Sequence, residues 1–329
     1  MKPYFLFIKP IILVTFFAIN PQSLLFAEPE GNDISQFDHV VAEDGSGDFT
    51  SVQEAIDASR SYPPERVRIF IKNGTYREKV TVHSWNTKLS LIGEDKQQTR
   101  IVYDDYFDRI DRGRNSTFHT FTLRVDANDF RAENLTIEND AGPVGQALAL
   151  FVEGDRAVFE NCRFLGHQDT IFTAGEGARH FFKDSYIEGT TDYVFGPGTA
   201  VFENCHLHSK RDSYITAAST PEGEPFGLVF KNCRLTADED VSEVYLGRPW
   251  RDFARTVFIA SDMGSHIKSE GWHNWGRPEA EETIFYAEYH GEHTPDGRVP
   301  WAKFLSEEEV QTYTLENIFR GWAPDENKK

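Results

Sequence analysis

A short strand-like phrase recurs along the middle of the chain. In each copy, β-branched or aromatic residues alternate with charged or polar ones, which is the period of a half-buried strand and not that of a helix. Three close copies and two looser ones occur, at residues 158–164, 201–207, 229–235, 130–137 and 181–187. The pattern therefore predicts a series of short β-strands.

The spacing of the phrases predicts how these strands are arranged. The polar markers Asn134, Asn161, Asp184, Asn204 and Asn232 follow one another at intervals of 27, 23, 20 and 28 residues. A repeat of this length with one strand-like phrase per unit is typical of a solenoid, and unequal intervals indicate loops of unequal length. We therefore predict an all-β coil in which the marker residues form a side-chain ladder.

A small residue follows the marker in four of these phrases, namely Cys162, Ser185, Cys205 and Cys233. We predict that these residues stack inward on successive turns, because thiols are commonly buried as small hydrophobic groups. Three cysteines are too few for a disulfide scaffold, and none has metal-ligand spacing. A disulfide between Cys205 and Cys233 stays open, since neighbouring strands lie only about 4.8 Å apart.

Two helical segments are expected to close the ends of the coil, as solenoids require. Residues 49–58 place Val52, Ala55 and Ile56 at helical spacing. Residues 306–309 have the form of a capping box and predict a helix that extends to about Tyr313. With no linker between these ends, we expect one domain over residues 38–322, preceded by an extension at 28–37 and followed by a tail at 323–329.

The N-terminus has the layout of a secretory signal peptide. Lys2 and Lys9 accompany an apolar run over residues 11–19, and residues 24–27 end in Ala27. The alternative is a membrane anchor, but the run is short and has polar or proline residues at its edges. We predict a signal peptide over residues 1–27 and a secreted or periplasmic mature chain without a membrane segment.

Removal of that segment would leave 34 − 2 = 32 basic and 53 acidic side chains, a net charge of −21. This balance argues against nucleic acid or an anionic membrane as a partner. It also disfavours a densely charged polyanion. Solubility is an equally good explanation of the acidity.

Four polar residues share the phase of the repeat. Gln146 and Gln168 are 22 residues apart, and Asp169 and Asp192 are 23 residues apart. Residues one turn apart lie on adjacent parallel strands, about 5 Å from each other. Two amides and two carboxylates therefore could converge on one face. Considered singly, Asp169 could instead form a turn or cap, and Gln146 could be an ordinary ladder residue.

At these residues the sequence closely resembles the pectin methylesterases. The resemblance extends from residue 41 to residue 313, and no single motif is as specific as the ordered set. The motifs that carry it are Val41-Ala-Glu-Asp-Gly-Ser-Gly-Asp-Phe-Thr50, Gly74-Thr-Tyr-Arg-Glu78, Gln146-Ala-Leu-Ala-Leu150, Gly166-His-Gln-Asp-Thr-Ile171, Gly189-Thr-Thr-Asp-Tyr-Val-Phe-Gly196 and Leu246-Gly-Arg-Pro-Trp250.

The resemblance implies a right-handed parallel β-helix with short capping helices and hydrolysis of galacturonate methyl esters in pectin. At matching positions it implies that Asp192 is the nucleophile and Asp169 the general acid and then base. It implies an oxyanion hole made by Gln146 and Gln168, with Arg248 as the charge partner of Asp192. No cofactor or metal is required. The expected partner is methyl-esterified homogalacturonan, and the expected state is a monomer.

Five further residues are candidate contacts for the substrate. Trp250 is expected to present an aromatic face to a sugar ring, whereas Phe195 and Phe172 fit either sugar contact or packing. Thr120 belongs to the same candidate set. His167 is not expected to act as a base but to adjust substrate preference.

The absence of an inhibitor-like region after the predicted signal peptide favours a bacterial-type enzyme over the long plant type. Polygalacturonases and pectate lyases share the expected fold and remain alternatives, because fold does not establish function. The two glutamines favour acyl chemistry over glycosidic cleavage. A non-catalytic polysaccharide-binding β-helix, or an esterase that does not act on pectin, is the remaining alternative.

Overall fold

The computed structural model describes Met1 and residues 34–291 and 295–324. The predicted signal peptide at 1–27, apart from Met1, lies outside these residues, as do most of the predicted extension at 28–37 and most of the tail at 323–329. Within the described residues, no helix is long and apolar enough to cross a membrane. The unit from Ile34 onward is built as one coil of strands.

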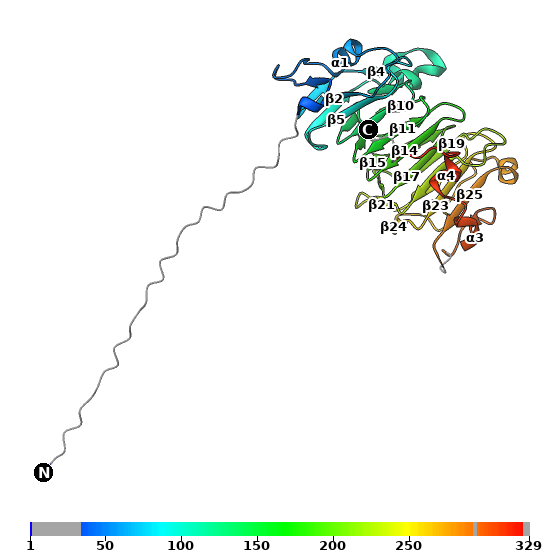
Figure 1. Cartoon of the computed structure of the whole chain (residues 1–329). Coiled ribbons are helices and arrows are strands. Elements are labelled where there is room, and N and C mark those ends of the chain that lie inside the picture. The colour runs from blue at the N-terminus through cyan, green and yellow to red at the C-terminus, as the bar shows by residue number, and fades with distance from the viewer. Residues whose placement is uncertain (2–33, 292–294, 325–329) are drawn as a thin grey trace. The chain divides into compact units, whose positions relative to one another are not determined.

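The strands of the described residues form three parallel sheets that run along the coil, so that colour in Figure 1 changes steadily from one end to the other. Sheet A has eleven described strands: β1 (His39–Val41), β2 (Val67–Ile71), β5 (Leu89–Gly93), β8 (Arg131–Glu133), β11 (Ala157–Glu160), β14 (Arg179–Lys183), β17 (Thr199–Glu203), β20 (Leu228–Lys231), β23 (Arg255–Ile259), β25 (Phe285–Tyr289) and β26 (Lys303–Phe304). Sheet B has eight described strands: β3 (Gly74–Arg77), β6 (Thr99–Tyr103), β9 (Thr136–Asn139), β12 (Arg163–Leu165), β15 (Tyr186–Gly189), β18 (His206–Ser209), β21 (Arg234–Ala237) and β24 (Asp262–Met263). Sheet C has seven described strands: β4 (Val80–Val82), β7 (Leu123–Val125), β10 (Leu150–Val152), β13 (Ile171–Thr173), β16 (Val194–Gly196), β19 (Tyr214–Ala218) and β22 (Tyr245–Gly247).

Most turns contribute one strand to each sheet in the order A, B, C, which is the predicted right-handed parallel β-helix. Helices are few and short in the described part of the chain. They are α1 (Val52–Ala58), α2 (Phe107–Ile110), α3 (Glu307–Val310) and α4 (Leu315–Ile318), with 3₁₀ segments η1 (Ile34–Gln36), η2 (Gly113–His119) and η3 (Pro278–Glu282).

The predicted polar ladder lies at the corner between sheets A and B. Asn134, Asn161, Asp184, Asn204 and Asn232 all have positive φ angles, between 50° and 56°. The Nδ2 of Asn161 donates to Oδ1 of Asn134 at 2.6 Å, and the Nδ2 of Asn204 donates to Oδ1 of Asp184 at 3.2 Å. Asn and Asp recur here because they tolerate the left-handed conformation that this corner requires. The ladder prediction is confirmed.

The core is centred on a column of stacked phenylalanines that point inward from sheet A. Phe159, Phe182, Phe202, Phe230 and Phe258 are in register on successive strands. Their ring centroids are 4.7, 4.5, 4.6 and 4.4 Å apart in turn, with the rings nearly parallel. Burial of apolar area and the stacked geometry together stabilise each turn against the next.

The small residues after the markers point inward, as predicted. Cys162, Ser185, Cys205 and Cys233 are at most 2% exposed. Each of the three cysteines is a free thiol, so no disulfide joins Cys205 and Cys233. Instead, the Sγ of Cys205 donates to the carbonyl oxygen of Phe182. Strand spacing permits a disulfide, but each thiol is directed at a backbone carbonyl of the preceding turn.

The outer face of sheet A is covered by the chain after β26, which the strand pattern did not predict. Val158, Val201 and Val229 point outward from sheet A yet are at most 3% exposed. They pack in one cluster with Ile318 and Phe319 at the end of α4. In Figure 1, α4 (red) accordingly lies beside strands from the middle of the coil.

The predicted N-terminal cap is present. The predicted C-terminal helix also forms, but it buries no residue in the interior of the coil, and its Val310 packs with the cluster on the outer face of sheet A. Val52, Ala55 and Ile56 of α1 are fully buried, as the helical spacing predicted. Ser306 and Glu309 form the capping box of α3. The helix ends at Val310 and not near Tyr313, because the chain turns after Gln311 and a second helix, α4, begins at Leu315.

Candidate active site

The four polar residues that share the repeat phase all lie just before strands of sheet C. Gln146 and Gln168 pair as a parallel bridge before β10 and β13. The backbone N–H of Asp169 donates to Thr191 O at 3.0 Å, so Asp169 lies beside the segment that carries Asp192. The predicted convergence on adjacent turns is therefore observed, and all four residues line one cleft.

Asp192 is paired with Arg248 in a two-point interaction. The Nε and Nη2 of Arg248 donate to Oδ1 and Oδ2 of Asp192 at 3.0 and 2.6 Å. Burial raises the pKa of Asp192, which is 6% exposed, and the hydrogen bonds and charge of Arg248 oppose that rise. This bidentate contact fixes the carboxylate plane and favours its ionised form.

Asp169 is in a different electrostatic environment. Its side chain is 8% exposed, and it accepts no hydrogen bond from any side chain of the described residues. Burial raises the pKa of Asp169 well above its usual value, the negative charge of Asp192 raises it further, and Arg248 acts in the opposite direction. Arg248 opposes the rise at Asp192 through direct hydrogen bonds, whereas Asp169 has no such partner, so the two pKa values are pushed apart, as a nucleophile and an acid require.

The backbone of both aspartates is in the left-handed region, with φ of +67° at Asp169 and +50° at Asp192. Each aspartate lies two residues before a strand of sheet C, Asp169 before β13 and Asp192 before β16. This conformation directs the carboxyl groups out of the coil and into the cleft, and aspartate adopts it more readily than most residues.

The cleft has a volume of about 530 Å³ and is lined by aromatic as well as polar groups. Trp250 and Phe195 both line it, with ring centroids 5.8 Å apart. Phe172 stacks on Phe195 at 4.7 Å and lines a second hollow of about 390 Å³, which also contains Trp250. The two phenylalanines are only 7% and 5% exposed, so they form a floor, whereas Trp250 is partly exposed.

Sequence reasoning missed several lining residues. Arg114 and Phe118 of η2 reach the cleft from the segment between β6 and β7, and Trp275 reaches it from the turn after Trp272. The length of the connection between β6 and β7 was a signal, because long connections often carry binding residues. Nothing in the strand pattern marks Trp275.

Two of the predicted substrate contacts lie outside the cleft. Thr120 is fully buried, and its Oγ1 donates to Thr117 O at 2.7 Å and accepts from the N–H of Leu148 at 3.0 Å. Thr120 therefore joins the backbone of Thr117 to the backbone of Leu148. His167 is half-buried and is not among the residues that line the cleft, although Gln168 and Asp169 follow it directly. The predicted contact of Thr120 with the substrate is wrong, because its side chain has no exposed surface, whereas the effect of His167 on substrate preference stays a prediction.

Among the described residues, no group of three or more His, Cys, Asp and Glu side chains could hold a metal ion. The cleft combines a carboxyl paired with a guanidinium, a second carboxyl whose pKa is raised further, and two amides. A carboxylate beside a carboxyl and amide donors suits acyl transfer through a covalent intermediate.

Comparison with known sequences places this chain in a family. Residues 38–322 match the pectinesterase family, and the chain belongs to it. It is 38% identical over 282 residues to Pectinesterase 31 of Arabidopsis thaliana, covering 82% of this chain and 88% of that protein. It is 35% identical over 306 residues to Probable pectinesterase/pectinesterase inhibitor 58 of the same plant, but there it spans only 52% of the relative's length.

Solved structures agree with the family assignment. Pectin methylesterase from carrot superposes with a TM-score of 0.80 at 32% identity, covering 87% of this chain and 93% of that one. Pectin methylesterase PemA from Erwinia chrysanthemi gives 0.76 at 29% identity, covering 88% and 98%. The expectation of a bacterial-type enzyme is not supported, because the curated relatives named above are plant proteins.

Proposed function

We propose that this protein hydrolyses the methyl esters of galacturonate units in pectin and releases methanol, within a single catalytic domain over residues 38–322. The observation that carries the proposal is the pair Asp169 and Asp192 in one cleft, with Asp192 held by Arg248 and the pKa of Asp169 raised. Family membership supports the same reaction, and one related pectin methylesterase has been solved in complex with a hexasaccharide.

In the first half-reaction, a carboxylate oxygen of Asp192 attacks the ester carbonyl carbon. Asp169 donates its proton to the departing methoxy oxygen, so methanol leaves and an acyl-enzyme anhydride remains on Asp192. The amide groups of Gln146 and Gln168 donate to the oxygen that becomes negative in the tetrahedral intermediate.

In the second half-reaction, the ionised Asp169 accepts a proton from water, and the water oxygen attacks the galacturonyl carbonyl carbon of the anhydride. The bond to Asp192 breaks, which restores its carboxylate and leaves a galacturonic acid unit, which then loses its remaining proton to the solvent. Arg248 stabilises Asp192 as the leaving carboxylate, since the guanidinium favours the charged form. Asp169 ends protonated, ready for the next ester.

The aromatic wall of the cleft supports contact with sugar rings. In this proposal Trp250 covers a sugar ring, and Phe195 and Phe172 provide the apolar floor; their positions in the lining of the two hollows support it. Arg114 and Arg251 also line the cleft and suit neighbouring free carboxylates. Because the chain as a whole is strongly acidic, we propose that highly methylated pectin is preferred over sparsely methylated pectin at low salt.

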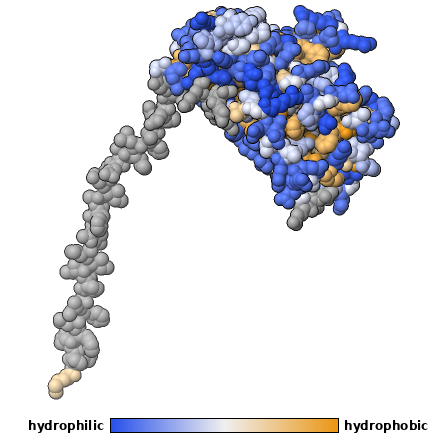
Figure 2. Space-filling model, turned by 45° about the vertical axis from the view of Figure 1, so that its right-hand side comes forward, coloured by the Kyte–Doolittle hydropathy of each residue, from blue (hydrophilic) through white to orange (hydrophobic). Residues whose placement is uncertain are grey.

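We also propose that the mature protein is a monomer, secreted or periplasmic, as its predicted signal peptide implies. The face shown in Figure 2 is mostly hydrophilic, with apolar residues between the hydrophilic ones, which supports a protein that works alone in water. Size-exclusion chromatography of the mature chain would test the monomer, and a dimer at micromolar concentration would contradict it.

The test of the reaction is methanol release from highly methylated pectin by the pure protein, with pH-stat titration of the acid formed. Stoichiometric methanol and acid are expected, without new reducing ends and without ultraviolet-absorbing unsaturated uronides. Reducing ends would indicate a polygalacturonase, and unsaturated products would indicate a lyase. Binding of pectin without any product would indicate a non-catalytic protein.

A further inference from the structure

A row of basic and aromatic side chains crosses the outer face of sheet B, separate from the cleft that sheet C carries. Arg163, Tyr186, His206 and Arg234 occupy register-matched positions on β12, β15, β18 and β21. We call these four residues the basic column. The residue that follows each of them along its strand, such as Phe164, is buried in the core. Because side chains alternate along a strand, the four residues of the column point outward.

Contacts within the column give it a defined geometry. The guanidinium of Arg163 lies over the ring of Tyr186 at 5.6 Å, and the rings of Tyr186 and His206 meet edge to face at 5.1 Å. The Oη of Tyr186 donates to Glu188 Oε2 at 2.9 Å, which fixes the ring, and Lys210 neutralises Glu188 at 2.9 Å. The aromatic part of the column is therefore held in place by its own neighbours.

The two arginines of the column form no ion pair in the described part of the chain, although Asp262 on β24 is register-matched to Arg234. Neither Arg163 nor Arg234 forms an ion pair or a side-chain hydrogen bond there, whereas Arg124, Arg156 and Arg179 each bind carboxylates. A chain of net charge −19 offers many carboxylates. Two unpaired guanidinium groups on one face of such a protein suit an anion supplied from outside.

A hollow of about 330 Å³ lies at the corner between sheets A and B. Three residues of the column, Arg163, Tyr186 and His206, line it. Lys96 lines it, and its Nζ donates to Oδ1 of Asn161. Asp184 is the one carboxylate among its described lining residues, and its Oδ1 accepts from Nδ2 of Asn204. Burial, followed by the charges of Arg234 and His208, lowers the pKa of His206, so the positive charge near neutral pH comes from the arginines and the lysine.

We infer that the basic column binds a de-esterified segment of galacturonan, outside the catalytic cleft. The inference rests on the proposed function, because it assigns the anionic product of that reaction to this face. Planar guanidinium groups match carboxylates in two-point contacts, and the ring of Tyr186 offers an apolar surface between them.

The spacing of the column sets the length of the ligand. Three steps between adjacent strands separate Arg163 from Arg234, which is about 14 Å at about 4.8 Å per step. A single galacturonate is too short to reach both guanidinium groups, so the site selects polymer or oligomer over monomer. Methyl esters remove the charge that the arginines recognise, so the column favours regions that the cleft has already processed.

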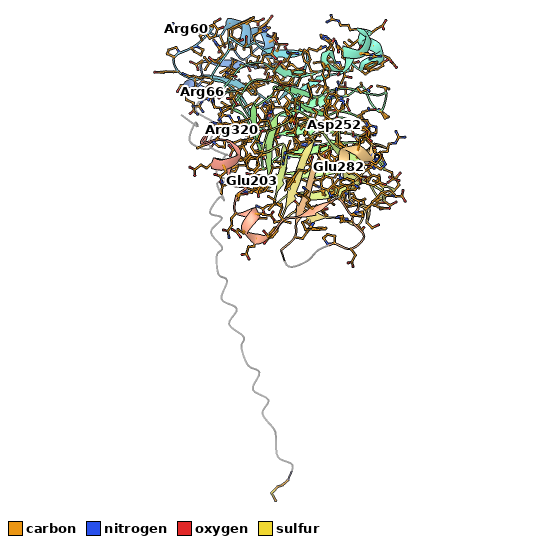
Figure 3. All side chains as sticks on the ribbon, turned by 90° about the vertical axis from the view of Figure 1, so that its right-hand side faces the viewer. Arg60, Arg66, Glu203, Asp252, Glu282 and Arg320 are labelled. Atoms are coloured by element: carbon orange, nitrogen blue, oxygen red, sulfur yellow. The ribbon has the colours of Figure 1, made fainter. Side chains whose placement is uncertain are left out.

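The experiment compares the double variant Arg163→Gln/Arg234→Gln with the matched control Arg60→Gln/Arg211→Gln. Arg60, which is labelled in Figure 3, and Arg211 are exposed arginines outside the column, so both double variants remove the same charge. Binding to polygalacturonate and to highly methylated pectin is measured by affinity electrophoresis at low salt. Methanol release is measured on a short methylated oligogalacturonate.

Loss of two charge-assisted contacts should weaken polygalacturonate binding by the column variant about tenfold. The control variant should bind like wild type, and both variants should keep methanol release and binding to methylated pectin. If both variants bound polygalacturonate equally weakly, or if neither bound it more weakly than wild type, the proposed site would be contradicted. Failure of the proposed function has a different signature, since the wild-type protein would then release no methanol whether or not the column binds polygalacturonate.

Discussion

The indole ring of Trp275 covers the guanidinium of Arg248, whose central carbon lies 3.8 Å from the ring centroid. Tyr214 lies against the same guanidinium at 4.1 Å. Arg248 is thus held by two aromatic rings while it binds both oxygens of Asp192. Trp275 is 38% exposed and has a φ of +56°, an uncommon conformation for a bulky residue. The turn that carries Trp275 thus combines this uncommon conformation with the contact to Arg248.

The first prediction concerns this aromatic contact. Trp275→Leu should lower kcat for methanol release about 2- to 30-fold, because a cation–π contact contributes about 0.5–2 kcal/mol to holding Arg248. Trp275→Phe should recover part of the loss. The control is Trp85→Leu, which removes another exposed tryptophan, stacked on His83 and absent from the cleft lining. Equal kcat in Trp275→Leu and wild type would show that Arg248 needs no such support.

The second prediction concerns the nucleophile. Asp192→Asn should leave a folded protein with kcat at least about a thousandfold lower, because an amide cannot form the acyl anhydride. Asparagine is the informative replacement, since it tolerates the φ of +50° that alanine would not. Methanol release and far-ultraviolet circular dichroism together check the outcome. Substantial turnover in a folded Asp192→Asn protein would exclude Asp192 as nucleophile.

The third prediction concerns the oxyanion donors. Gln168→Leu should lower kcat about 100- to 1,000-fold with little change in KM, the usual cost of removing one such donor. Gln146→Leu should have a similar effect. Gln97→Leu is the matched control, because Gln97 is an exposed glutamine outside the cleft. A rise in KM at constant kcat would instead assign these amides to ground-state binding of the substrate.

The sequence predicted the repeat, the inward stack of small residues and the convergence of the glutamines and aspartates, because all depend on the period of the coil. It did not predict the segment that covers sheet A. The alternation of residues along a strand does not show whether its outward valines contact water or a segment distant in sequence. Figure 3 shows that this cover and the catalytic side lie on opposite sides of the coil. Arg320 marks the covering segment, and Asp252, which lines the same hollow as Trp250, marks the catalytic side. Contacts of this kind depend on the path of loops, which periodicity does not encode.

The error at Thr120 has a related cause. Thr120 is close in sequence to the cleft residue Phe118, yet side-chain direction outside a strand is not fixed by alternation. Trp275 and Arg114 were missed for the converse reason, since they reach the cleft from irregular segments. A periodic pattern thus locates the residues at strand ends and leaves those on loops undetermined.

The fourth prediction concerns the pH dependence of the reaction. kcat/KM for methanol release should rise with pH as Asp192 ionises and fall as Asp169 loses its proton. Because burial raises the pKa of Asp192, the rise should be centred above 3.8, and it should move to higher pH in Arg248→Gln, which lacks the opposing charge. The pH profile of residual activity provides the check. An unshifted acid limb in Arg248→Gln would contradict this account of the pair.

The last prediction links Asp169 to stability. Its folded-state pKa is raised well above the unfolded value of 3.8. The protonated carboxyl therefore contributes stability that is fully present below pH 3.8 and is lost as the pH rises through the folded-state pKa. Asparagine cannot ionise and tolerates the φ of +67° at this position. Asp169→Asn should consequently abolish turnover but raise Tm above that of wild type by at least about 2 °C at neutral pH.

Thermal unfolding followed by circular dichroism across the pH range measures this effect. The Tm advantage of Asp169→Asn should shrink on acidification and disappear near pH 3.8, because both side chains are then uncharged. Asp44→Asn is the control, since hydrogen bonds from Ser46 lower the pKa of that exposed carboxyl and its replacement should give no gain at neutral pH. A Tm difference between Asp169→Asn and wild type that is the same at acidic and neutral pH would show that ionisation of Asp169 carries no cost, and would remove the basis for its role as the acid.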